Sequence, residues 1–126
     1  MIAAVNVTVL GVADLDRSTR FYVEDLGCSP VRMTEPVPGR HWHELGFDGG
    51  GTRLALLNAD GWQVPPRPGP ALTLTCADVA STVADLRGRD VEVSGPVETP
   101  WGLSAQLTDP DGHVLILGEA GPGSAP

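Results

Sequence analysis

The sequence has no lysine and no long apolar run, and each absence narrows the functions open to it. All eight basic residues are arginines, and the chain has sixteen acidic residues, which gives a formal net charge of -8 at pH 7. A chain with this charge repels a phosphate backbone, which disfavours nucleic acid as a partner. No stretch approaches the roughly 20 apolar residues that a membrane-spanning helix needs. We therefore expect neither a nucleic-acid nor a membrane partner, and a cationic or neutral small molecule fits the charge better.

Cysteine is also scarce, with only Cys28 and Cys76 and no CxxC spacing. Reduced, packed thiols of this kind are typical of cytoplasmic proteins. The N-terminus shows no basic segment followed by the apolar stretch of a signal peptide, so we expect a cytoplasmic location. With 126 residues and a hydrophobic fraction of 41%, the chain can bury a core without disulfides.

The sequence lacks the common catalytic motifs as well. There is no nucleophile elbow, no HExxH and no thiol beside an obvious base. The run Gly49–Gly51 follows Asp48 between two strand-like segments and leads into no helix, so it indicates a turn and not a phosphate-binding loop.

What the sequence does contain is an internal repeat. Val12–Leu15 matches Cys76–Val79, and Asp48–Leu56 matches Asp109–Leu117 in the character of its residues. The first pair links a strand-like run to a helix-like segment, and the second is a tight turn that leads into an apolar strand. The pattern predicts an α+β fold of two similar modules.

The expected elements follow from capping and turn residues. Asp14 and Asp78 are candidate N-caps, and Gly27 is a candidate glycine just past a helix end. Strands are expected near 3–12, 29–34, 41–47 and 52–58 and again near 71–76, 91–94, 102–108 and 113–119, with helices near 16–26 and 79–88.

These elements predict one domain over residues 1–120. Module one covers 1–58 and module two covers 71–120, joined by a linker at 59–70 whose prolines and glycines disfavour regular structure. Residues 121–126 are expected to form a disordered tail.

Two segments carry a family resemblance. Gly11–Tyr22 followed by Leu26 and Gly27, together with Trp101-Gly102 followed by Asp109–His113, resembles the glyoxalase / bleomycin resistance protein / extradiol dioxygenase (vicinal oxygen chelate) superfamily. The resemblance implies two βαβββ modules whose curved mixed sheets enclose a cavity, with helices outside, and a homodimer. His113 replaces the usual asparagine of the family's turn and is expected to be exposed and structural.

The resemblance also implies where a metal would bind, on the first and last strands of each module. Those positions correspond here to Val7, Ala55, Ala71 and Ile116, and none of these side chains can coordinate a cation. We therefore expect no metal and no cofactor. This departure places the chain nearer the bleomycin-resistance branch, whose members bind a drug without consuming it.

Strand alternation predicts which side chains line the cavity, with one conflict. Arg53 and the second-module residues Ser104 and Gln106 face inward. The repeat alignment places His41 and His43 inward too, but it buries Glu44 on the other side, which would be costly. If the strand slips by one residue, Trp42 and Glu44 line the cavity instead.

Several chemistries stay open for these residues. The histidines could act as acid–base groups, Trp42 could stack on a planar ligand with Glu44 meeting a cation, and Arg53 could meet an anion. Exposed strand residues or dimer contacts explain the same pattern. The candidate ligand-binding residues are His41, Trp42, His43, Glu44, Arg53, Trp62, Trp101, Ser104 and Gln106.

The leading hypothesis is a metal-free protein that binds a small molecule, such as an antibiotic or another natural product. The alternative is a glyoxalase-like lyase, isomerase or dioxygenase that acts without metal or with a displaced metal site. A structural role without any ligand is the third possibility.

Overall fold

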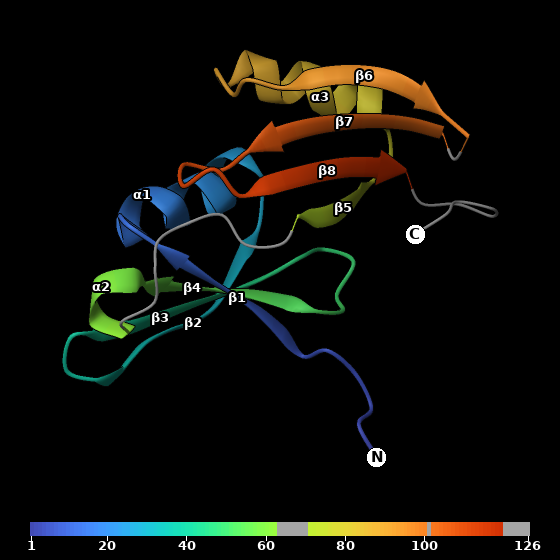
Figure 1. The fold of residues 1–126 in the computed structure, drawn as a ribbon. Helices are drawn as coiled ribbons and strands as arrows, with labels where there is room; N and C mark the ends of the chain where they lie inside the picture. Colours follow the sequence, from blue (N-terminus) through green and yellow to red (C-terminus); the bar gives the residue numbers. More distant parts are fainter. Residues whose placement is uncertain (63–70, 101, 120–126) are drawn as a thin grey trace. The chain divides into compact units, whose positions relative to one another are not determined.

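The computed structural model describes residues 1–62, 71–100 and 102–119. The chain divides into two compact units, Met1–Arg67 and Pro68–Pro126, and each contains one four-stranded sheet (Figure 1). Among the described residues, no helix is both long and apolar enough to cross a membrane.

The first unit has the predicted βαβββ order. Its sheet has the strand order β1-β4-β3-β2, in which β1 runs parallel to β4 and the other neighbours are antiparallel. The first and last strands of the module in chain order are therefore neighbours in its sheet. The elements are β1 (Val7–Val12), α1 (Leu15–Arg20), η1 (Phe21–Asp25), β2 (Ser29–Val37), β3 (Arg40–Gly46), β4 (Arg53–Asn58) and α2 (Ala59–Trp62).

The helix of the first unit begins and ends where its capping residues predict. The Asp14 side chain accepts a hydrogen bond from the backbone N–H of Arg17 at 3.1 Å. At the other end Gly27 has a φ of 81°, and the N–H of Cys28 donates to the carbonyl of Tyr22 at 2.9 Å. The last turn, η1, is a π-helix, for which the sequence carries no recognisable signal.

The second unit repeats the same topology with the strand order β5-β8-β7-β6. The Asp78 side chain caps α3 by accepting from the N–H of Ser81 at 3.1 Å, which confirms the predicted N-cap. The unit consists of β5 (Leu72–Cys76), α3 (Val79–Gly88), β6 (Ser94–Thr99), β7 (Gly102–Thr108) and β8 (Val114–Glu119).

The predicted strand at 91–94 is wrong in position, because β6 begins at Ser94. Val91 and Val93 have the apolar alternation of a strand, but they are buried core residues between the end of α3 and β6. The N–H of Val91 donates to the carbonyl of Leu86, so this segment closes the helix, and residues 91–93 belong to none of the strands that the structure describes.

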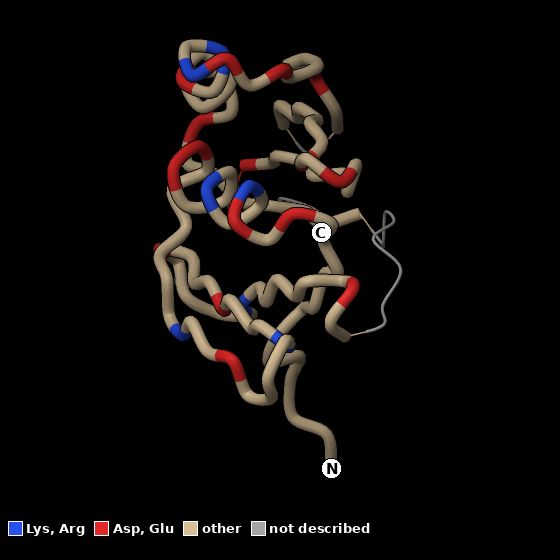
Figure 2. Tube along the Cα trace, turned by 90° about the vertical axis from the view of Figure 1, so that its left-hand side faces the viewer, with Lys and Arg blue, Asp and Glu red and all other residues tan. Residues whose placement is uncertain are grey.

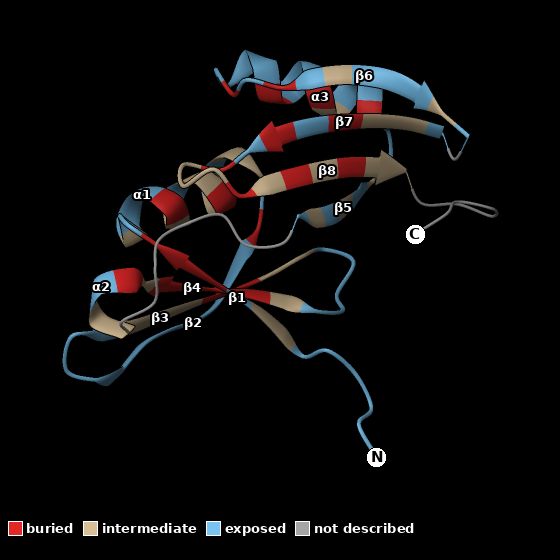
Figure 3. Ribbon diagram, viewed as in Figure 1, coloured by how far each residue is buried: buried red, intermediate tan, exposed pale blue. Residues whose placement is uncertain are grey.

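Each unit buries one face of its sheet under its helix. α1 packs on β4, and α3 packs on β6, β7 and β8. Figure 3 shows the consequence for the first sheet, where β4 is mostly buried and the edge strand β2 is exposed along its whole length. The apolar helix-side core consists of Leu10, Val12, Leu45, Leu54 and Leu56 in the first unit and Val79, Val83, Leu86, Leu107, Leu115 and Leu117 in the second.

The segment predicted as an irregular linker contains regular structure at its start. Ala59–Trp62 form α2, a short helix directly after β4, so the prediction is wrong for these four residues. The rest of the linker, 63–70, and the tail at 121–126 lie outside the described residues.

Candidate ligand-binding face

The register of β3 decides which side chains share a face with Arg53. Glu44 pairs with Ala55 and Trp42 pairs with Leu57 across the antiparallel β3–β4 ladder. Directly opposite residues point to the same side of a sheet. The side of the first sheet away from α1, called the open face below, therefore carries Val7, Val9, Gly11, Trp42, Glu44, Arg53, Ala55 and Leu57.

The first predicted register for this strand, with His41 and His43 on the open face, is wrong. His43 pairs with Leu56 and contacts α1 on the other side of the sheet, where its Nδ1 lies 2.8 Å from Thr19 Oγ1. The Thr19 hydroxyl donates its only proton to the carbonyl of Leu15 at 2.7 Å. Nδ1 of neutral His43 must therefore carry the proton and donate to Thr19.

The surroundings of His43 disfavour its charged form. Burial lowers the pKa of His43 below its usual 6.5, and the charge of His41 lowers it further, while Asp16 acts in the opposite direction. His43 is thus a neutral residue of the helix–sheet contact at pH 7, and an acid–base role on the open face does not fit its position.

Glu44 is buried on the open face because two neighbours compensate its carboxylate. Oε1 accepts a hydrogen bond from Trp42 Nε1 at 2.9 Å, and Oε2 lies 2.6 Å from Arg53 Nε. The Arg53 N–H is not aligned for a hydrogen bond to that oxygen, so this contact is an ion pair. The Glu44 side chain is 4% exposed and that of Arg53 is 40% exposed, so one end of the pair reaches solvent.

A second indole lies beside Trp42 at the end of the sheet. The ring centroids of Trp42 and Trp62 are 6.4 Å apart with planes inclined at 58°. Trp62 Nε1 donates to the carbonyl of His41 at 2.9 Å, and the Arg40 guanidinium lies 5.6 Å from the Trp62 ring centre. Trp62 is therefore fixed in place as part of the first unit and extends the aromatic surface beyond Trp42.

Asn58 connects α2 to the β2–β3 hairpin. Its Oδ1 accepts from the N–H of His41 at 2.8 Å, and its Nδ2 donates to the carbonyl of Gly39 at 2.9 Å. The His41 ring lies at this end of the hairpin, with Nε2 3.3 Å from Glu35 Oε2. These bonds position the helix that carries Trp62, and the sequence alone gave no sign of them.

The second unit places its predicted residues on one face of its own sheet. Gln106 pairs with Ile116 across β7–β8, and Ser104 pairs with Gly118. Thr73 of β5 also pairs with Ile116, so Ser104 and Gln106 share a face with it, as predicted from alternation. Trp101 lies outside the described residues.

The strand positions at which the resemblance implies metal ligands do not fit a metal here. Val7 and Ala55 lie on the open face of the first sheet, and Ile116 lies on the corresponding face of the second. Ala71 directly precedes β5. All four side chains are hydrocarbon and offer no donor atom, so no metal-dependent step can be built on them.

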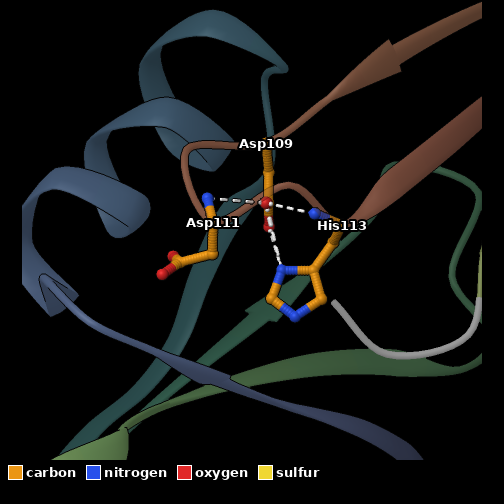
Figure 4. A group of neighbouring side chains, drawn as sticks. All are labelled: Asp109, Asp111 and His113. Atoms are coloured by element: carbon orange, nitrogen blue, oxygen red, sulfur yellow. Dashed lines mark hydrogen bonds and ion pairs between the residues drawn. The ribbon is translucent and has the colours of Figure 1, made fainter. Parts of the chain in front are cut away.

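One group of potential metal ligands occurs elsewhere among the described residues, in the β7–β8 turn (Figure 4). Asp109, Asp111 and His113 bring one ligand atom each within 4.8 Å of the others. Oδ1 of Asp109 already accepts from the backbone N–H groups of Asp111 and His113 at 3.0 and 2.9 Å. His113 Nδ1 lies 2.8 Å from Asp109 Oδ2. These bonds account for the cluster as the closure of a turn.

The expectation that His113 is exposed is wrong. The residue is 1% exposed, and its ring is held by the Asp109 carboxylate. A histidine can occupy this buried position because the Asp109 carboxylate provides a hydrogen-bond partner for one of its ring nitrogens. The turn sequence gave its structural role but not its burial.

Comparison with known proteins agrees with this architecture. Residues 4–117 match the family model of the Glyoxalase/Bleomycin resistance protein/Dioxygenase superfamily. The chain belongs to this superfamily. The match spans both units, so the two βαβββ modules of the superfamily correspond to the two sheets described above.

Three proteins similar to this superfamily member share between 25% and 32% of their residues with it. TnmS3, described as an antibiotic binding protein from Streptomyces sp. CB03234, is 32% identical, with a TM-score of 0.81 over 95% of this chain and 98% of its own. A superfamily member from Sphaerobacter thermophilus DSM 20745 is 27% identical, with a TM-score of 0.83 over 94% and 98%. The uncharacterized protein YetH of Bacillus subtilis is 25% identical over 94% of this chain and 100% of its own.

Proposed function

We propose that this superfamily member binds a small organic molecule on the open face of its first unit, without a metal ion. The observation that carries the proposal is the composition of that face. Trp42, Glu44 and Arg53 supply an aromatic surface and polar groups, while the positions of the usual metal ligands hold Val7 and Ala55. A mostly apolar surface with a few fixed polar groups is typical of small-molecule sites.

The similarity to TnmS3 supports an antibiotic or another natural product as the ligand. A protein that protects by sequestration acts through mass action, so it needs tight binding and amounts comparable to those of the ligand. It needs no catalytic base. The position of His43 under α1 agrees with this, because it removes one histidine that could have served on the open face.

The test is a screen of natural products by quenching of tryptophan fluorescence, followed by calorimetry of the compounds that bind. Trp42→Leu is expected to weaken binding by about tenfold or more, since a stacking aromatic contributes roughly 1–3 kcal/mol. Met33→Leu is the matched control, because Met33 pairs with His43 and so lies on the other side of the sheet. Equal loss in both variants would place the ligand elsewhere.

The same titrations distinguish binding from catalysis. Ligand recovered unchanged after prolonged incubation with the protein supports sequestration. Conversion of the ligand, detected by mass spectrometry with and without a chelator, would instead support the enzymatic alternative and show whether it depends on a metal.

We also infer that the chain forms a homodimer, as the resemblance implies. The exposed strand β2 carries Val31, Met33 and Val37, each more than 40% exposed, which is apolar surface that a second copy could cover. Light scattering coupled to size-exclusion chromatography tests this inference, and a monomer at micromolar concentration would refute it.

A further inference from the structure

The guanidinium of Arg53 is only partly used by the protein. Its Nε forms the ion pair with Glu44, whereas its two terminal nitrogens have no hydrogen bond or ion pair to any residue that the structure describes. The side chain is 40% exposed. Arg53 therefore carries a planar pair of terminal N–H donors at a strand position on the open face, and the Glu44 carboxylate keeps its guanidinium close to that face.

Glu44, by contrast, has little capacity left for a ligand. One carboxylate oxygen accepts from Trp42 Nε1, the other faces Arg53 Nε, and the side chain is 4% exposed. A cationic ligand would have to displace Arg53 to reach it. The idea that Glu44 meets a cation is thus less favourable than the idea that Arg53 meets an anion.

Trp42 adds a fixed aromatic surface beside these donors. The bond from its Nε1 to Glu44 ties the indole to the same carboxylate that orients Arg53. Glu44 therefore contacts two recognition groups, one aromatic and one cationic, and holds both on the same face of the sheet. Such pre-organisation lowers the entropy lost when a ligand binds.

From this juxtaposition we propose that the ligand is a planar aromatic compound that carries an acidic oxygen, either a carboxylate or a phenolate. The ring stacks on Trp42, and the oxygen accepts from the terminal nitrogens of Arg53. Glu44 is a positioning residue that contacts both groups. The inference rests on the proposed function, since it names the ligand class of the same site.

The overall charge makes this a demanding prediction. The chain has a net charge of -8, and acidic residues are spread over both units (Figure 2), so the general field favours cations. A preference for an anion must then arise locally, at Arg53. Measurements at about 0.15 M salt reduce the long-range contribution, because the screening length there is roughly 8 Å.

The experiment compares two planar tricyclic probes, acridine-9-carboxylate and the cation 9-aminoacridine, by calorimetry with the full chain. Wild-type protein is expected to bind the carboxylate about tenfold more tightly, the size of effect that a charge-assisted hydrogen bond gives. Arg53→Gln is expected to abolish that preference. Arg20→Gln, which removes the same charge from the exposed side of α1, is the matched control and is expected to retain it.

The outcomes separate the inference from the proposed function. Equal or stronger binding of the cation by wild type, or an unchanged preference in Arg53→Gln, overturns the inference and leaves small-molecule binding in place. Binding of neither probe at millimolar concentration by folded protein also overturns the inference, whereas the proposed function fails only if no compound of the natural-product screen binds. If Arg53→Gln does not fold, Glu44→Gln/Arg53→Gln removes both charges together and is expected to show the same loss of preference.

Discussion

Arg53 Nε lies 2.6 Å from Glu44 Oε2, and this pair joins the middle of β3 to the first residue of β4. The relationship explains how a carboxylate with 4% exposure can lie on a sheet face among apolar residues. It also ties the stability of the first sheet to the groups proposed to bind the ligand. Each half of the pair should therefore have a measurable effect on folding.

Removing Arg53 alone should cost more than removing both charges. Arg53→Met leaves the Glu44 carboxylate buried without its counter-charge. This is expected to lower the free energy of unfolding by about 1–3 kcal/mol, a range that already allows for the partial exposure of the arginine. Glu44→Gln/Arg53→Met should recover part of this loss, because no unpaired charge remains. Urea unfolding of the two single variants and the double variant measures the coupling. Additive losses would show that the pair does not interact.

Gly61 is expected to tolerate no side chain. A Cβ at this position would overlap the carbonyl oxygen of Gly39 and crowd the Asn58 amide, both of which form the contact between α2 and the β2–β3 hairpin. Gly61→Ala should destabilise the protein by roughly 1–3 kcal/mol. Gly88→Ala is the control, since a Cβ there meets nothing within 4 Å at the end of α3, and it should be neutral or stabilising by about 1 kcal/mol or less. Similar losses in both variants would contradict this account.

The stability of the protein should fall on mild acidification because of His43. Its pKa in the folded state is lowered below the 6.5 of the free side chain, so the unfolded chain binds a proton more readily. The stabilisation is full above about pH 6.5 and is lost as the pH falls below that value. Thermal melting between pH 7.5 and 5.5 measures the decline.

His43→Asn separates this effect from other titrations. The asparagine amide can still donate to Thr19 Oγ1 but does not titrate. The variant should therefore show a shallower loss of stability over the same range. A decline as steep as that of the wild type would assign the pH dependence to other groups.

The two cysteines should differ in reactivity. Burial raises the pKa of Cys28 to about 11, with a further contribution from Asp48, and burial also raises the pKa of Cys76. At pH 8 roughly one Cys28 thiol in a thousand is then ionised. A disulfide reagent such as DTNB should modify Cys76 before Cys28 and should modify both much faster after unfolding. Rapid labelling of two thiols in the folded protein would contradict the burial of Cys28.

Divalent metals should leave the stability of the protein unchanged. A metal ion that binds the folded state and not the unfolded state raises the melting temperature. Since we expect no such binding, zinc, nickel or manganese at tenfold excess should shift the melting temperature by no more than about 1 °C. The β7–β8 turn is the place to examine if a larger shift occurs. In that case Asp111→Asn should abolish the shift, since Asp111 contributes its side chain to the cluster in Figure 4.

The sequence predicted those features that depend on local chemistry. The N-caps at Asp14 and Asp78 and the left-handed Gly27 follow from short-range hydrogen bonds and backbone freedom, and all three are confirmed. The repeat and the family motifs predicted the order of the strands, because turns and alternation are also local. The family match over residues 4–117 confirms the resemblance.

The register of β3 depended on a contact that no local pattern reveals. Both alternating sets of that strand, His41 with His43 and Trp42 with Glu44, are polar or amphipathic, so alternation could not choose between them. A buried Glu44 looked costly because its counter-charge belongs to the next strand, at Arg53. The position of Trp62 was missed for a similar reason, since its partners lie on the β2–β3 hairpin.

The parallel pairing of β1 with β4 has a consequence for how the chain matures during synthesis. Val7 pairs with Arg53 and Leu10 with Leu56, so the first strand of the module has no partner in its sheet until the last strand of the module has been synthesised. Non-local pairing of this kind slows folding. The apolar residues Val9 and Leu10 therefore remain unpaired while most of the first unit is translated. The same order applies to β5, which pairs with β8. The sheet of each module can therefore form completely only after its last strand has been synthesised.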